Sequence, residues 1–122
     1  MSTQLPVRFI KTVNPSAVFV NSTEGLTPDS VDTKTISYVV KYFLTGIYVS
    51  VSGEAKVEIR IGTPTLEAVK RIFYTTKADQ NVGWILQEPM EIPIDRDVVI
   101  EVTNKDIANV DLSSTVQGYQ IA

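Results

Sequence analysis

Carboxylates are the side chains of this sequence that could do acid or base chemistry, because its 122 residues include no histidine and no cysteine. These two absences exclude the catalytic triads and dyads that depend on an imidazole or a thiolate. A pair of carboxylates could still act as acid and base, as in glycoside hydrolysis. The nominal candidates are Glu58, Glu67, Glu88, Glu91, Asp95, Asp97 and Glu101.

The placement of these carboxylates argues against an active site. Glu58 and Glu101 fall on the polar faces of segments in which apolar and polar residues alternate. Asp95 and Asp97 lie between two strand-like segments, where aspartate ordinarily serves turn geometry. We therefore expect surface and turn roles for these residues, no catalytic residue and no enzyme activity.

Oxygen ligands for a calcium ion could come from two loop segments, one with Asp95 and Asp97 and one with Asp106, Asn109 and Asp111. Neither segment has the spacing of an EF-hand loop, so we expect no metal site. The six glycines are scattered, and none lies in a phosphate-binding motif. We therefore expect no nucleotide and no other cofactor.

Exposed tyrosine and tryptophan rings are another way in which a β-sandwich could bind a ligand, because sugars stack on such rings. The candidates are Trp84, Tyr38, Tyr42, Tyr48, Tyr74 and Tyr119. Tyr48 falls opposite the apolar face of its segment, so it is the tyrosine that we expect on an outer face. The alternative, packing in the core or at a subunit interface, is favoured by neighbouring phenylalanines. We take Tyr38, Tyr42 and Tyr48 as possible interface residues.

Composition and charge indicate a folded chain with no attraction for nucleic acid. Hydrophobic residues make up 43% of the sequence and charged residues 20%, which is typical of a globular protein, and the length suits one domain. The formal net charge of −3 supplies no basic field for a phosphate polymer. Residues 1–10 lack the apolar run of a signal peptide, and residues 36–51 are too short and too polar to span a bilayer. We expect neither a nucleic-acid nor a membrane partner.

Period-two alternation of apolar residues predicts an all-β fold. It is clearest in residues 56–61 and 97–103, where every second residue is valine or isoleucine. Residues 46–62 are predicted to form a β-hairpin that turns at Gly53 and Glu54. Further strands are predicted at residues 7–11, 17–20, 36–44, 69–76, 82–87, 91–94 and 115–121.

Many short strands without long intervening helices predict an antiparallel β-sandwich, jelly-roll-like, with about eight to ten strands. We expect a single domain over residues 1–122, with residues 1–34 partly an extended arm or long connections, because residues 12–34 are polar and contain turn formers. Residues 36–44 are apolar on both faces of a strand. Together with the open edges of a sandwich, this predicts a homo-oligomer, with a trimer favoured. The alternative is that residues 12–34 cover the second face within one subunit.

The C-terminal third of the chain contains a series of short motifs. An apolar strand with an aromatic residue, GWIL from Gly83, precedes a proline-containing edge, PMEIPI from Pro89; the strand VVIEVTN follows from Val98, and STVQGYQI from Ser114 ends the series. In this order the motifs resemble small β-sandwich virion proteins of tailed bacteriophages. The resemblance covers roughly residues 83–121 and marks no individual contact residue.

The resemblance implies a head decoration protein, located in the virion after assembly in the host cytoplasm. Such a protein would bind copies of itself and the major capsid protein or another virion protein, and would stabilise the capsid lattice. The alternative function is a ligand-binding β-sandwich, such as a carbohydrate-binding or receptor-binding module.

Overall fold

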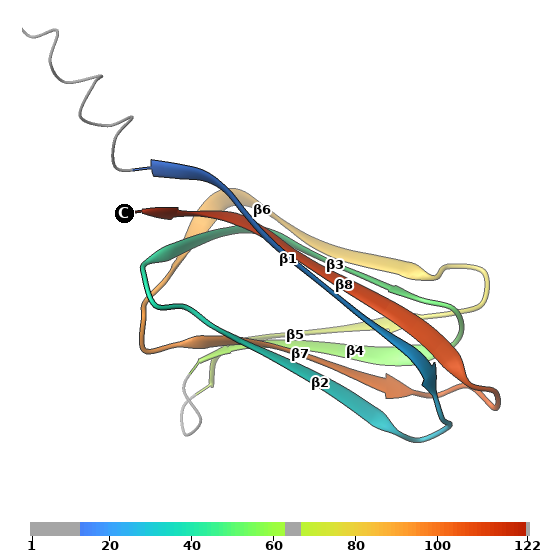
Figure 1. Ribbon diagram of the computed structural model, residues 1–122. Coiled ribbons are helices and arrows are strands. Elements are labelled where there is room, and N and C mark those ends of the chain that lie inside the picture. Colours follow the sequence, from blue (N-terminus) through green and yellow to red (C-terminus); the bar gives the residue numbers. More distant parts are fainter. Residues whose placement is uncertain (1–12, 63–66, 122) are drawn as a thin grey trace, which may run out of the picture.

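The computed structural model describes residues 13–62 and 67–121, which form eight β-strands in two layers (Figure 1). The strands are β1 (Val13–Leu26), β2 (Val31–Ser37), β3 (Tyr42–Val51), β4 (Ala55–Gly62), β5 (Glu67–Thr75), β6 (Asn81–Ile92), β7 (Asp97–Asn104) and β8 (Val110–Ile121). The predicted all-β sandwich is therefore confirmed. The described residues include no helix that is long and apolar enough to cross a membrane.

The order of strand pairing makes the sandwich a jelly roll. One sheet, here called sheet A, has the order β1-β8-β3-β6, and the other, sheet B, has the order β2-β7-β4-β5. The first strand thus pairs with the last, β2 with β7, β3 with β6 and β4 with β5, as in one long hairpin rolled over two sheets. The antiparallel pairs β3–β8 and β4–β7 then complete the two sheets.

The core fills the space between the sheets and comes mainly from alternate residues of the central strands. Ile59 of β4 and Ile100 of β7 are paired and buried, as are the apolar residues two positions to either side of each. On β3 the alternation changes phase at Thr45, where a β-bulge lets both Leu44 and Ile47 face the core. The strand phases predicted for β4 and β7 are confirmed.

The prediction of one strand over residues 36–44 is wrong. β2 ends at Ser37 in sheet B and β3 begins at Tyr42 in sheet A, so the segment crosses from one sheet to the other. Ile36 contributes to the core from sheet B, and Tyr42 and Leu44 contribute from sheet A. Tyr38, where the chain crosses, is also buried, whereas Val39 is 90% exposed. The second apolar face therefore does not require a neighbouring subunit.

The polar residues 12–34, predicted as a connection or arm around one short strand, instead supply most of two strands, β1 and β2. Both strands lie at sheet edges, where fewer side chains reach the core, which explains their polar sequence. Residues 82–87 and 91–92 belong to one strand, β6, whose register against β3 shifts partway along, and the predicted residues 93–94 lie beyond its end. The strand predicted at residues 7–11 lies outside the described residues.

Hydrogen bonds tie together the connections at one end of the sandwich, on the right in Figure 1. The buried Asn104 donates its side-chain amide to the carbonyls of Leu26 (2.8 Å) and Ala108 (3.0 Å). The buried Asp106 accepts hydrogen bonds from the backbone N–H of Glu54 (3.0 Å) and of Ala108 (3.2 Å). These bonds, chiefly the one from Glu54, hold the pKa of the Asp106 carboxyl below its usual range although burial opposes them.

We predict that Ile59→Ala and Ile100→Ala each lower the free energy of unfolding by about 2–5 kcal/mol, because each removes side-chain volume from between the sheets. Urea unfolding followed by the fluorescence of the single tryptophan would measure the loss. Thr33→Val, at an exposed position of β2, is the control and should change the value by less than about 0.5 kcal/mol. Isoleucine variants as stable as this control would contradict the strand phases.

Candidate functional site

Tyr48 lies on the outer face of sheet A, where side chains from β3, β6 and β8 surround an open hollow of about 510 Å³. Its cross-strand neighbours are Gly83 on β6 and Thr115 on β8. A β-carbon at Gly83 would lie 3.1 Å from Cδ1 of the tyrosine ring, and a β-carbon at Gly46 would lie 3.0 Å from its hydroxyl oxygen. The ring therefore occupies the space that side chains at these two positions would fill.

The lining of this hollow is neutral. Around the tyrosine are the hydroxyls of Ser50, Ser113 and Thr115, the amide of Asn81 and the aliphatic side chain of Ile85. None of the described residues that line it carries a charge. An aromatic ring bordered by hydroxyl and amide groups can hold an uncharged polar molecule by stacking and hydrogen bonding.

The other two tyrosines predicted as interface residues, Tyr38 and Tyr42, are buried in the core. Their rings stack with centroids 4.1 Å apart, and the ring of Phe19 meets Tyr38 edge-on with centroids 5.7 Å apart. Burial raises the pKa of Tyr42 to about 12 and raises that of Tyr38 far above its usual value. Because neither side chain has surface to offer a second chain, the interface role stays a prediction for Tyr48 alone.

The remaining aromatic candidates differ in whether the ring contacts another side chain. The guanidinium of Arg71 lies 5.0 Å from the ring centroid of Trp84, and Phe43 stacks on Tyr119 with centroids 5.2 Å apart. Tyr74, on β5, is exposed. Trp84 and Tyr119 are thus each paired with another side chain of the same protein.

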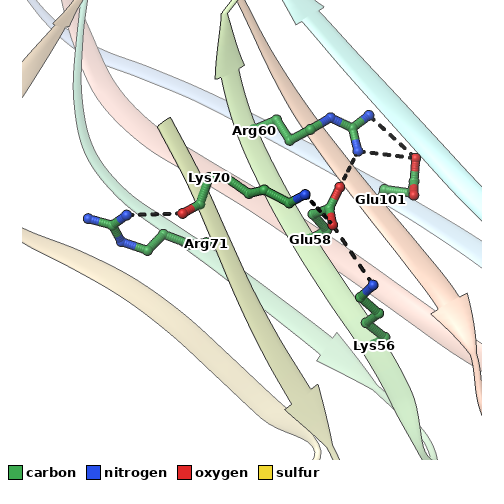
Figure 2. Close-up of polar contacts among 6 residues, drawn as sticks. All are labelled: Lys56, Glu58, Arg60, Lys70, Arg71 and Glu101. Carbon is green, nitrogen blue, oxygen red and sulfur yellow. Dashed lines mark hydrogen bonds and ion pairs between the residues drawn. The ribbon is translucent and has the colours of Figure 1, made fainter. Parts of the chain in front are cut away.

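Glu58 is the centre of an ion-pair cluster on the outer face of sheet B (Figure 2). Its carboxylate accepts a hydrogen bond from Arg60 and lies 3.9 Å from Nζ of Lys56 and 3.6 Å from Nζ of Lys70. Arg60 in turn lies 3.4 Å from a carboxylate oxygen of Glu101. Since Lys70 is on β5 and Glu101 is on β7, the cluster links three neighbouring strands.

Glu58 is less exposed than its place on the polar face of a strand predicts, with a relative exposure of 9%. Burial raises the pKa of its carboxyl, but the hydrogen bond from Arg60 and the charges of Lys70 and Lys56 outweigh this and hold the pKa below its usual range. A carboxylate that is kept ionised among three cations is poorly suited to act as a general acid. Its geometry indicates a structural role.

Three of the four carboxylates considered as calcium ligands, Asp97, Asp106 and Asp111, form hydrogen bonds within the chain. Asp97 accepts a hydrogen bond from the hydroxyl of Ser37 (2.7 Å), and Asp111 accepts one from the N–H of Gly25 (2.8 Å). Asp106 accepts the hydrogen bonds from the backbone amides of Glu54 and Ala108 described above. In residues 13–62 and 67–121, no three acidic side chains gather in a way that could hold a metal ion.

No family model and no curated protein matches this chain. Solved structures that it resembles include a protein of Bacillus endospore appendages, which are disulfide-linked pili (10% identity, 89% of this chain and 91% of that chain, TM-score 0.48). Others are TmCBM61 in complex with β-1,4-galactotriose (8%, 93% and 92%, TM-score 0.46) and the virus-like particle of Macrobrachium rosenbergii extra small virus (14%, 86% and 79%, TM-score 0.39).

We predict that Glu58→Gln lowers the free energy of unfolding near pH 7 by about 1–3 kcal/mol, because three cations lose the anion between them. The folded-state pKa of Glu58 lies below the unfolded value of about 4.3. Its contribution is therefore complete above that value and is lost as the pH falls through the folded-state pKa. The difference between the original protein and the variant should shrink in acid.

Urea titrations over a series of pH values would measure this difference. Glu101→Gln is the matched control, and it should cost less than about 1 kcal/mol because Glu101 is more exposed and contacts only the edge of the cluster. A Glu58→Gln loss that stays constant into strong acid, or a larger loss for Glu101→Gln, would contradict the central role of Glu58.

Proposed function

We propose that this chain is a non-catalytic structural protein of a virion that assembles with its own copies through the edge strand β1. The observation that carries the proposal is the composition of that edge. β1 is 14 residues long, lies at the rim of sheet A and has no charged residue from Val13 to Thr23. Val18 and Val20 on this stretch are 50% and 65% exposed.

Edge strands present unpaired backbone groups and are normally protected by charge, proline or a covering element. The other three edge strands of this sandwich each carry at least two charged residues: Asp32 and Lys34 on β2, Lys70 and Arg71 on β5, and Glu88 and Glu91 on β6. β1 has Pro15 and a register shift near its start, and Glu24 and a second register shift near its end. Among residues 13–62 and 67–121, no further strand pairs with the free side of β1, and its uncharged middle suits pairing with another chain.

A second copy of this chain is the partner that this edge fits best. Two β1 strands can pair without bringing like charges together, because the stretch that would pair is neutral. A virion protein that is present in several copies on a capsid lattice would use such a contact between its copies. The major capsid protein would then bind the resulting oligomer. The virion setting comes from the resemblance of residues 83–121 to bacteriophage proteins.

A non-catalytic role is supported by the carboxylates, which are the remaining candidates for acid or base chemistry. Glu58 is held ionised by Arg60 and two lysines, and Asp106 and Asp111 accept hydrogen bonds from backbone amides. These interactions give the three carboxylates structural roles in the sandwich.

We predict that the protein self-associates at high micromolar concentration and that the double variant Val18→Lys/Val20→Lys does not. Two lysines would place charge beside the open edge and oppose pairing with a second copy. Light scattering after size-exclusion chromatography would give the mass, with the monomer at 13.5 kDa.

Val31→Lys is the matched control, because Val31 is 51% exposed on β2, an edge strand of the other sheet. This variant should associate like the original protein. A monomeric mass for the original protein would refute self-association, and an oligomer that survives the β1 lysines would assign the contact to another surface.

A further inference from the structure

We infer that the hollow around Tyr48 is a binding site for a neutral saccharide. The first reason is the placement of the tyrosine ring. Its neighbours Gly46 and Gly83 lack side chains, and a β-carbon at either position would come within 3.0–3.1 Å of an atom of the tyrosine side chain. The ring can therefore lie close to the backbone at these two positions, and it lines the hollow.

The second reason is the arrangement of polar groups beside this ring. Ser50 pairs with Asn81 on one side and with Ser113 on the other, so three polar side chains form a row across β6, β3 and β8. Tyr48 and Thr115 form the next row. Rows two residues apart along a strand are separated by about 6.6 Å, so a sugar ring stacked on the tyrosine would bring its hydroxyls to the polar row.

The third reason is the chemical match between this lining and a sugar. Hydroxyls both donate and accept hydrogen bonds, and an amide side chain offers two donors and an acceptor. A pyranose presents the complementary set, hydroxyls around its rim and C–H groups on a face that can pack on an aromatic ring. The hollow, at about 510 Å³, is within the usual size of small-molecule sites.

Other ligand classes fit this lining less well. A phosphate or nucleotide would need cations, and the described residues that line the hollow include none. A purely apolar ligand would cover Ser50, Asn81 and Ser113 without replacing their hydrogen bonds to water, which is unfavourable. A neutral polyhydroxylated molecule needs no cation, and its hydroxyls can form hydrogen bonds with the polar side chains that it covers.

This site is separate from the assembly contact proposed above. Pairing through β1 extends sheet A sideways, whereas the hollow lies over β3, β6 and β8 on the outer face. The saccharide site can therefore be occupied in the monomer and in the assembled protein, and each proposal can fail without the other.

The test is a titration of the ¹⁵N-labelled protein with methyl glycosides of glucose, galactose and N-acetylglucosamine, followed by amide chemical shifts. At least one of them should cause saturable shifts at millimolar concentration in residues 48–50, 81–85 and 113–115. Methyl glucuronoside, which is negatively charged, should shift these amides less. The absence of saturable shifts with all three neutral probes, or shifts confined to other regions, would overturn the inference.

Three variants separate binding from folding. Tyr48→Ala should weaken binding at least about tenfold, whereas Tyr48→Phe, which keeps the ring, should retain it. Thr115→Val keeps the side-chain shape without the hydroxyl and should weaken binding about three- to tenfold with little change in melting temperature. Tyr74→Ala, an exposed tyrosine on sheet B, is the control and should bind like the original protein. Undiminished binding by both Tyr48→Ala and Thr115→Val would overturn the inference.

Discussion

Two apolar sheet faces packed against each other are the constraint on which the rest of this molecule depends. Ile59 and Ile100 pair within sheet B, Ile47 and Val116 pair within sheet A, and all four are buried between the layers. Because side chains alternate along a strand, each core residue directs its neighbours to an outer face. The surface available for function is therefore two outer faces, four edge strands and two sets of connections. One set of connections is held together by Asn104 and Asp106, whose buried polar groups require partners.

The two outer faces are chemically different, and the difference follows from which strands meet. On sheet B, the register of β5, β4 and β7 brings Lys70 into reach of Glu58, and Arg60 into reach of Glu101, so these charges are paired within the protein. On sheet A, the same kind of register gathers serines, a threonine and an asparagine around Tyr48, and these groups have no charged partner in the hollow. A face whose charges are already paired has less to offer a ligand than a face of open hydroxyls and one aromatic ring.

Much of the fold could be predicted from alternation, and the errors share one cause. β4 and β7 are central strands with one buried face, so their pattern is strict and their phase could be read directly. Residues 36–44 are apolar at nearly every position, which is equally typical of a strand covered on both faces and of a chain that crosses between two sheets. β1 is an edge strand rich in serine, threonine and asparagine, so its sequence has no apolar period and predicts only a short strand, residues 17–20, within a connection or arm. A one-dimensional pattern reports burial, and it identifies a strand only where burial follows the strand period.

The candidate site shows the same limit more sharply, because its geometry depends on register. Alternation was enough to place Tyr48 on an outer face, but it could not place Tyr38 and Tyr42, which lie where the chain leaves one sheet and enters the other. Gly83 is 35 positions from Tyr48 in sequence and becomes its neighbour only through the pairing of β3 with β6. The signal that could have found it is the jelly-roll order itself. Once the first strand is paired with the last and the pairing is followed inward, the strand of Gly83 must lie beside the strand of Tyr48, and the missing side chain of the glycine then explains why the aromatic ring can come so close to β6.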